Sequence, residues 1–366
     1  MRIESIYHAV TQRVDKMKRA YFLASDERKF SQTFDMPLRH RLRLYRHGFM
    51  SRAAALYDIT RPNAYLSDFA RYIYTPEING DWSVFLNNKL AFHYLLSDHE
   101  ENRANVYAVL QNGRAHPLHG SRKGAGEKTA GKNAGDWVRD CLDREEKIVI
   151  KPITGGGGEN IRLCQDLGGR YTVNGTVYSP SEFEQLVDDL DEYLVSEFIE
   201  QAAYATEIYP SAPNTIRVLT MIDPVTDESF IAMAVHRIGS DASGCLDNVE
   251  QGGFATEVDR ETGRLSAAAQ WQEGTLEWYR THPDTDTRIA DTQVPGWESI
   301  RARLLSIADE LSYIPYIGWD ILVTGPGEFR IVEGNDHSDV EFLQVHWPLL
   351  TDERVRRFYE AHGVIK

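Results

Sequence analysis

Apolar side chains follow two different periods along the chain. Up to about residue 57 they recur at helical intervals, as at Ile6, Val10, Val14, Met17 and Tyr21. Further along, short apolar or β-branched runs are separated by turn residues and by amphipathic helical stretches, a pattern typical of mixed strands and helices. We therefore expect an α+β fold with a mainly helical N-terminal segment.

Several segments can be assigned individually. Apolar or alternating runs predict strands at residues 147–152, 193–200, 214–221 and 231–239. Helical spacing predicts helices at 181–187 and 298–311. In the second of these, Ile300, Leu304 and Ile307 share one face, and Pro315 follows its end.

Oxygen-bearing side chains gather in a predicted hairpin near the C-terminus. Residues 318–323 and 329–335 flank a Gly-Pro-Gly turn and should pair as antiparallel strands. A turn centred near Pro326 sets Asp320 opposite about residue 332, so that Glu333 and Asn335 lie beside it. Side chains two apart on a strand share a face, and hard oxygen ligands suit Mg²⁺. An acidic strand end in an acidic protein is the alternative interpretation.

A run of four glycines follows the predicted strand that carries Lys151: Gly155, Gly156, Gly157 and Gly158. Backbone N–H groups without side chains can close on a polyphosphate, and a lysine on the preceding strand adds a positive charge. The run is neither a P-loop, because no Gly-Lys-Ser/Thr follows, nor a dinucleotide fingerprint, because the spacing differs. A flexible hairpin tip is the alternative.

The order of these features resembles one known family. A lysine with a glycine flap, an apolar strand that ends in acids, and a hairpin with Asp, Glu and Asn follow one another along the chain. Over roughly residues 80 to 350 the chain resembles the sugar-transfer associated ATP-grasp family. Members of that family resemble carboxylate–amine ligases and are thought to act in cell-surface polysaccharide biosynthesis. The resemblance implies an ATP-grasp fold, in which two α+β subdomains clasp ATP.

The resemblance also implies a division of the chain into four segments. A helical N-terminal region would span 1–80, and a pre-grasp helix with the nucleotide-flap subdomain would span 81–200. A C-terminal ATP-grasp subdomain with the metal hairpin would follow over 201–350, and a C-terminal helix over 351–366.

The nucleotide and metal ligands are carried over from the family by position. Lys151 would bind ATP phosphate under the glycine flap, and Lys89, in the helical stretch 87–96, would be a second phosphate ligand. Alternatively Lys89 is a solvated lysine near a helix start, on a helix that buries Leu86, Leu90 and Tyr94. The backbone of the hinge would meet adenine at Glu197, Phe198 and Ile199. The resemblance makes Mg²⁺ ligands of Asp320, Glu333 and Asn335.

Two arginines are further candidates for the site. Arg217 lies among apolar neighbours on a predicted strand, where an unpaired cation would be costly, so we expect an anionic partner. The resemblance sets it near the transferred phosphoryl group or an acyl phosphate, whereas a structural salt bridge is the competing role. Arg237 ends the next strand, and His236 beside it is expected to be a packed or surface residue. The resemblance assigns to the acceptor side Arg237 and three residues of the following loop, Asn248, Gly252 and Gly253.

The implied reaction joins a small-molecule carboxylate to an amine, with sugar-linked substrates among the candidates. ATP and Mg²⁺ would convert the carboxylate into an acyl phosphate, and the amine would displace phosphate. Two other functions remain open. One is a sugar or polyol kinase with Asp336, Asp339 or Glu250 as general base. The other is a nucleotide-sensing module that regulates glycosyl transfer without catalysis.

Composition excludes several classes of protein. The chain has 366 residues and a formal net charge of −15, which opposes general binding to nucleic acid or to an anionic membrane, although a local basic patch is still compatible with it. No stretch reaches about 18 uninterrupted apolar residues, so we expect no membrane span, and the start lacks an apolar secretory segment. A cytoplasmic protein is expected. The three cysteines are widely spaced, which argues against a disulfide framework or a zinc site.

Two segments differ in composition from the rest. The run 39–47 is basic, and it either contacts an acidic partner, a polyanion or a membrane surface, or forms a solvated helix face that pairs with acids elsewhere in the chain. The glycine- and lysine-containing stretch 120–135 is expected to be a mobile surface loop. The sequence indicates no oligomeric state.

Overall fold

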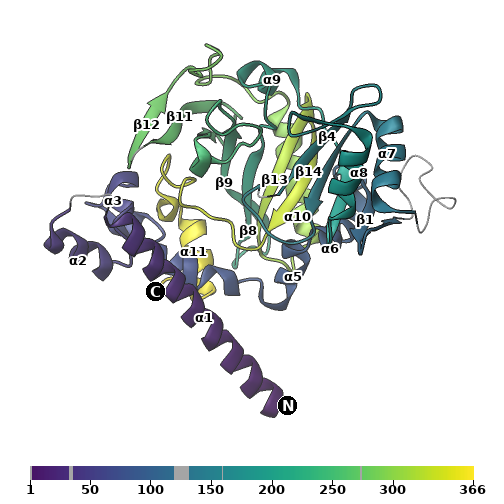
Figure 1. Cartoon of the computed structure of the whole chain (residues 1–366). Helices are drawn as coiled ribbons and strands as arrows, with labels where there is room; N and C mark the ends of the chain where they lie inside the picture. Colours follow the sequence, from purple (N-terminus) through teal and green to yellow (C-terminus); the bar gives the residue numbers. More distant parts are fainter. Residues whose placement is uncertain (1, 33–35, 119–131, 159, 273) are drawn as a thin grey trace.

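Two antiparallel sheets of seven strands each form the centre of the molecule (Figure 1). The computed structural model describes residues 2–32, 36–118, 132–158, 160–272 and 274–366. Most of the loop expected at 120–135 lies outside these residues, whereas Gly135 belongs to a helix rather than to a loop. The expected α+β architecture with a helical N-terminal segment is confirmed.

The first sheet is covered by two helices. Its strand order is β2-β1-β7-β3-β4-β5-β6, and helices α7 (Ala134–Glu145) and α8 (Pro180–Asp188) bury Trp137 and Phe183 against it. Helix α8 begins with a capping box, in which Ser179 and Glu182 satisfy each other's backbone N–H groups. The strands of this sheet are β1 (Val106–Gln111), β2 (Arg114–Pro117), β3 (Lys147–Pro152), β4 (Arg162–Asp166), β5 (Tyr171–Val173), β6 (Thr176–Tyr178) and β7 (Tyr193–Glu197).

The second sheet is covered on both faces. Helix α10 (Trp297–Glu310) packs on one face, and helix α11 (Glu353–Ala361) packs on the other together with N-terminal segments. Consequently every residue of β8 is buried, as are the first eight of β13, which explains their nearly continuous apolar sequences. The strand order is β12-β11-β10-β9-β8-β13-β14. The strands are β8 (Ile216–Ile222), β9 (Ser229–Ile238), β10 (Phe254–Val258), β11 (Leu265–Gln272), β12 (Thr275–Tyr279), β13 (Tyr316–Gly325) and β14 (Glu328–Asn335).

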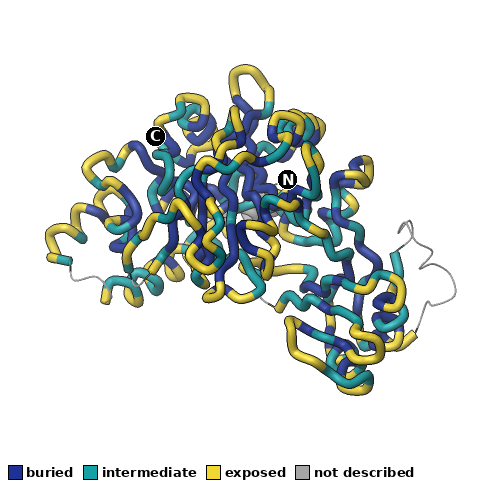
Figure 2. The backbone as a smooth tube through the Cα atoms, turned by 90° about the horizontal axis from the view of Figure 1, so that it is seen from above, coloured by how far each residue is buried: buried dark blue, intermediate teal, exposed yellow. Residues whose placement is uncertain are grey.

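Short helices connect the N-terminal segment to the sheets. Helix α1 projects from the body toward the N-terminus, with α2 beside its other end (Figure 1). Figure 2 shows buried residues concentrated in the sheets and exposed residues on the outer helices and loops. None of the described helices is long and apolar enough to cross a bilayer. The α-helices not yet given bounds are α1 (Arg2–Phe30), α2 (Leu38–Arg46), α3 (Ala53–Leu56), α4 (Asp68–Ile73), α5 (Ser83–Asn87), α6 (Lys89–Leu95) and α9 (Ala203–Ile208).

The predicted hairpin forms with a register one residue further than expected. Asp320 lies opposite Glu333 and not residue 332, because the ladder shifts by a β-bulge between Asp320 and Ile321. The helix expected at 298–311 is found one residue earlier, as α10. The division of the chain at residues 80, 200 and 350 stays a prediction.

Gly296, which precedes α10, provides a test of how the hairpin turn is supported. Its φ is +69°, and a Cβ there would overlap the backbone nitrogen of Gly327 in the turn between β13 and β14. We expect Gly296→Ala to lower the free energy of unfolding by about 3 kcal/mol, from left-handed strain plus overpacking. Urea denaturation would measure it.

Gly175→Ala is the matched control, since Gly175 also has positive φ (+81°) but open space around it. This variant should lose only about 1 kcal/mol. Equal losses in the two variants would show that the contact with the turn carries no weight.

Candidate nucleotide and metal site

Residues of both sheets line one cavity of about 440 Å³. Nearly every residue that the sequence pointed to lies on its wall, although the positions span more than two hundred residues of chain. Those that the structure brings together there are Lys89, Lys151, Gly155, Gly156, Gly157, Gly158, Glu197, Phe198, Ile199, Arg217, Arg237, Asn248, Asp320, Glu333 and Asn335.

The hairpin of β13 and β14 supplies the oxygen-bearing side chains. Asp320 and Glu333 are direct partners in the ladder, and Asn335 is opposite Gly318, whose carbonyl accepts its side-chain amide at 3.1 Å. Between them, Gly334 has no side chain, and a Cβ at this position would meet the ring of Phe92. Glycine at position 334 therefore allows helix α6 to pack directly on β14, the strand that carries the candidate metal ligands Glu333 and Asn335.

Asp320 is held by two arginines on neighbouring strands. Arg217 on β8 donates from both Nε and a terminal nitrogen, the latter at 2.8 Å, and Arg237 on β9 donates to Oδ2 at 3.1 Å. Burial alone would raise the pKa of Asp320, which is only 1% exposed, but the arginines hold this pKa well below its usual range. The anionic partner expected for Arg217 is therefore this carboxylate. The guanidinium still lines the cavity, so the salt bridge and a ligand role are compatible.

Arg237 is oriented by side chains that the sequence did not indicate. Thr215 accepts two hydrogen bonds from its guanidinium, at 3.0 and 2.6 Å, and Asp247 lies 3.4 Å from Nε. Asp247 directly precedes Asn248, so its position beside the candidate loop was the feature of the sequence that could have indicated it. His236 is completely buried, as expected for a packed residue. Its Nε2 lies 3.0 Å from the hydroxyl of Tyr204.

Lys89 owes its position to a break between two helices. The helical stretch expected at 87–96 is interrupted at Asn88, whose side chain accepts from two backbone N–H groups and caps α6. Lys89 thus lies at the start of α6, with Nζ 2.6 Å from the carbonyl oxygen of Gly155 and 3.6 Å from Glu333. The expected buried stripe is partly wrong: Leu86 is buried, but Tyr94 is exposed because Phe92 faces the hairpin instead.

Lys151 is an almost completely buried cation on β3. It is 6% exposed, and its Nζ donates to the carbonyl of Val332 at 3.2 Å. Burial lowers the pKa of Lys151 to about 8, although the charge of Glu333 opposes this shift. The pKa of Glu333 is in turn raised, first by burial and then by Asp320. An anionic phosphate group would offset the electrostatic cost of the positive charges on Lys151 and Lys89 in this cavity.

The glycine flap lies against the loop after β9. Gly155, Gly157 and Gly158 all have positive φ, between 71° and 98°, which only glycine adopts without strain. Asn248 donates to the carbonyl of Gly157 at 3.0 Å, so this loop residue contacts the flap directly. Gly252 and Gly253 are not among the residues that line the cavity.

These two glycines instead close the base of the loop. A Cβ on Gly253 would meet the carbonyl oxygens of Asn248 and Ile238 within about 3 Å, and Gly252 has φ +100°. Their substrate role stays a prediction, and the structure gives them a conformational one.

The hinge lies at the end of β7. The backbone nitrogen of Glu197 donates to Asn105 at 3.0 Å, and the ammonium of Lys147 lies 5.0 Å from the ring centre of Phe198. Among the described residues, no backbone hydrogen bond involves Phe198 or Ile199. Their amides and carbonyls therefore remain for a planar base in the cavity.

The family model for sugar-transfer associated ATP-grasp proteins matches residues 70–353, which is most of the chain. The chain belongs to the sugar-transfer associated ATP-grasp family. The family resemblance and the ATP-grasp fold expected from the sequence are thereby confirmed. No curated protein matches the chain in sequence.

Solved structures resemble this ATP-grasp chain only distantly. They include an N5-carboxyaminoimidazole ribonucleotide synthetase (12% identity, TM-score 0.36, 69% of this chain and 45% of that one) and the ATP-grasp ligase PsnB (12%, 0.36, 73% and 57%). D-cycloserine synthetase DcsG is a third (11%, 0.39, 76% and 71%). This chain thus spans about half the length of the first two proteins.

The donor set of the hairpin fits a hard divalent cation. Asp320 and Glu333 offer carboxylate oxygens, and Asn335 turns its amide nitrogen to Gly318, which leaves the amide oxygen as a further donor. Among the described residues no three acidic, histidine or cysteine side chains gather into a metal cluster. An ion held here would therefore need Asn335 or phosphate oxygens to complete its coordination.

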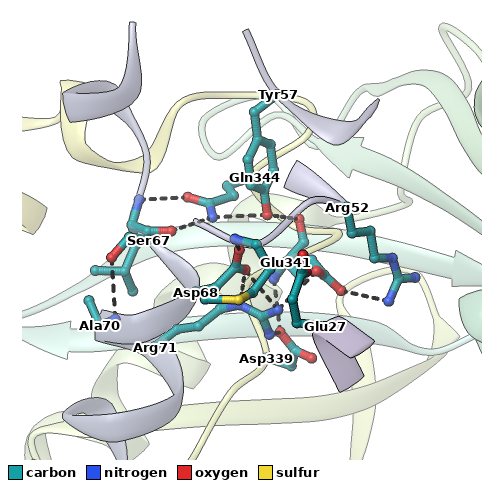
Figure 3. Close-up of polar contacts among 12 residues, drawn as sticks. Glu27, Arg52, Tyr57, Ser67, Asp68, Ala70, Arg71, Asp339, Glu341 and Gln344 are labelled. Atoms are coloured by element: carbon teal, nitrogen blue, oxygen red, sulfur yellow. Dashed lines mark hydrogen bonds and ion pairs between the residues drawn. The ribbon is translucent and has the colours of Figure 1, made fainter. Parts of the chain in front are cut away.

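Two further carboxylates line the cavity in this ATP-grasp protein. Glu250 and Asp339 lie on its wall, with side chains 60% and 52% exposed. Both are fixed by buried arginines. Arg52 lies 3.0 Å from Glu250. Arg71 lies 2.7 Å from Asp339 (Figure 3). Glu341 forms ion pairs with both arginines, at 3.1 Å with Arg52 and 2.9 Å with Arg71.

Arg52 and Arg71 were missed by the sequence analysis. Both come from the helical N-terminal region. Arg71 also pairs with the nearby Asp68, but Glu250, Asp339 and Glu341 lie about two hundred or more residues from the arginines that they contact. The available signal was an arginine within an apolar helix, as in Asp68–Ile73. Asp336, a candidate base, is not among the residues that line the cavity.

The buried ammonium of Lys151 predicts a pH dependence of stability. The folded-state pKa is about 8 and the ordinary value is 10.5, so the unfolded chain keeps the proton to higher pH. Stability should therefore rise from pH 8 toward 10.5, by up to about 3 kcal/mol, as the cost of the buried charge disappears. Lys151→Met should remove this part of the slope in urea denaturation across the pH range. Lys147→Met, at the less buried start of the same strand, should retain it, and a variant slope equal to wild type would contradict the assignment.

Proposed function

We propose that this chain is an ATP- and Mg²⁺-dependent ligase that activates a carboxylate as an acyl phosphate and joins it to an amine. The observation that carries the proposal is the set of charged residues that line the cavity. Lys89, Lys151, Arg217 and Arg237 line it beside the glycine flap, together with carboxylates such as Glu250 and Asp339. The family description supports a role linked to sugar transfer, and we propose cell-surface glycan biosynthesis in the cytoplasm.

The lysines and the flap would bind the nucleotide. Lys151 and Lys89 would contact phosphate oxygens, the amides of residues 155–158 would close over them, and the backbone of Phe198 would meet the base. Asp320, Glu333 and Asn335 would hold Mg²⁺, which when bound supplies charge neutralisation at the phosphates. These roles account for two buried or half-buried lysines whose partners among the described residues are carbonyl oxygens and Glu333.

The arginines would bind the carboxylate substrate. Arg217 and Arg237 both present donors to the cavity, and a guanidinium fits two oxygens of a carboxylate or phosphoryl group. They would hold the carboxylate while its oxygen attacks the γ-phosphorus and the bond from that phosphorus to the bridging oxygen of ADP breaks. The amine nitrogen then attacks the acyl carbon, and phosphate leaves.

Asp339 and Glu250 support an amine as the second substrate. Each carboxylate has one oxygen on a buried arginine, and among the described residues no hydrogen-bond donor contacts its second oxygen. Such an oxygen would bind the ammonium form of the acceptor, and Asp339 would take the proton that the nitrogen loses. The products are then an amide, ADP and phosphate.

A sugar or polyol kinase is the second candidate, because an exposed carboxylate in the same cavity would also serve as base for a hydroxyl. Phosphate and ADP release with Mg²⁺-ATP, measured against a panel of amino acids, uronic acids and amino sugars, separates the two. A product lighter by one water than its two substrates supports the ligase, whereas a substrate that gains only a phosphoryl group supports the kinase. Nucleotide binding without turnover on any substrate would contradict both.

Glu333→Gln tests the metal carboxylate without changing its shape. We expect Mg²⁺-dependent ADP production to fall about a hundredfold or more, because a charge that orients the phosphates is lost. Glu328→Gln, at the exposed start of the same strand, is the control and should retain full activity. Near-normal turnover by Glu333→Gln, with an unchanged thermal midpoint, would overturn the assignment.

Asp339→Asn tests the amine end of the cavity. The variant should raise the KM for the amine about tenfold, since a hydrogen bond to a charged group is lost, while the KM for ATP stays constant. Arg71 keeps Asp68 and Glu341 as partners, so the fold should survive. Asp336→Asn is the control, and an equal rise in both variants would contradict the specific role.

A further inference from the structure

Helix α2 (Leu38–Arg46) exposes an apolar stripe beside a basic stripe. Leu38, Leu42 and Tyr45 are 69%, 57% and 38% exposed, and their spacing of four and three residues puts them on one face. Arg39, Arg43 and Arg46 repeat this spacing one residue further, so the two stripes run side by side along the whole helix.

These arginines have no acidic partner among the described residues of a chain rich in acids. The protein has 55 acidic and 40 basic residues, yet residues 36–57 contain no Asp or Glu. Within the part of the chain that the structure describes, Arg39, Arg43 and Arg46 form no ion pair, whereas many other surface arginines do, such as Arg301 with Glu261 at 2.7 Å. The expected pairing of the basic run with acids elsewhere in the chain is therefore not found for these three among the described residues.

Contacts elsewhere on α2 hold the helix on the protein. Leu44, on the side away from the apolar stripe, is buried in the cluster beneath the second sheet, together with Phe49. Tyr45, although part of the stripe, donates its hydroxyl to Glu27 of α1 at 2.5 Å, and Arg41 donates to the carbonyl of Ser31 at 2.6 Å. The exposed stripes are thus on a helix with fixed orientation and not on a fraying end.

We propose that α2 docks the protein on the surface of an anionic lipid bilayer. Arginines beside an apolar stripe on one helix match an interface that offers phosphates at its surface and hydrocarbon just beneath it. A soluble polyanion would use the arginines but would leave Leu38 and Leu42 without a role. A second copy of this chain that docked its own α2 against this helix would present the same positive charges and be repelled.

The position of α2 is compatible with catalysis at the surface. Figure 1 shows α2 at the edge of the molecule, far from the first sheet and its glycine flap. Docking there would leave the cavity between the sheets accessible to ATP. Because the surface is separate from the cavity, the proposal stands independently of the reaction proposed above.

Co-sedimentation of the full-length protein with vesicles tests the proposal. Vesicles of phosphatidylcholine alone are compared with an equimolar mixture of phosphatidylcholine and phosphatidylglycerol. The wild type should bind the mixed vesicles and not the neutral ones. Arg39→Gln with Arg43→Gln should weaken the partition constant about 25-fold, at about fivefold per arginine. Leu38→Asp with Leu42→Asp should abolish binding.

Matched controls change the same residue types elsewhere. Arg114→Gln with Arg170→Gln removes two exposed arginines, and Leu167→Asp with Val225→Asp adds two charges at exposed apolar positions. Both should retain binding, and all variants should keep the wild-type thermal midpoint.

Three results would overturn the proposal. One is no binding of wild type to mixed vesicles, and another is equal binding by wild type and the Leu38→Asp, Leu42→Asp variant. The third is a larger oligomer in wild type than in this variant by light scattering, without vesicle binding, which would assign the stripe to a contact between copies of the chain.

Discussion

The site depends on a charge that is buried in the middle of a sheet. Asp320 is held by Arg217 and Arg237, so one carboxylate connects β8, β9 and β13. The surrounding strands are apolar and covered on both faces, where an unpaired ion would be strongly destabilising. Loss of any one of these three residues would therefore leave a buried charge with a missing partner, and the same arrangement presents both arginines and a carboxylate to the cavity.

This arrangement suits the exchange of partners that metal–nucleotide binding would involve. A cation at Asp320 would compete with the arginines for carboxylate oxygens, and phosphate or carboxylate oxygens would compete with Asp320 for the guanidinium groups. A cation or an anion that bound alone would leave one of the buried side chains with a weaker ion pair. A cation at Asp320 and an anion at the two arginines would together satisfy all three side chains, so the ion pairs of Asp320 would favour binding of both ions over binding of either one.

Features that are adjacent in the sequence could be predicted, because local periods determine them. Strand alternation sufficed to bring Asp320, Glu333 and Asn335 to one end of a hairpin, and the bulge after Asp320 changed the register by only one residue. The interruption before Lys89 needed knowledge of the contact between Asn88 and Thr154, which local periodicity does not contain. Arg71 contacts Asp68 three residues before it, but its partners Asp339 and Glu341 are 268 and 270 residues away, so no local pattern could assign those two.

Buried cations influence the electrostatic potential of the cavity more strongly than the exposed acids of the protein surface do, because solvent screens them less. The net charge of −15 is spread over the whole chain, and salt screens exposed charges beyond about 8 Å at physiological ionic strength. Lys151 and Arg217 are buried, so their field in the cavity is weakened far less than that of surface acids. These buried cations would favour an anion in the cavity despite the overall charge, and Glu250 and Asp339, held by Arg52 and Arg71 on the same wall, would favour a cation. Two substrates of opposite charge would therefore each meet side chains of opposite charge in this cavity.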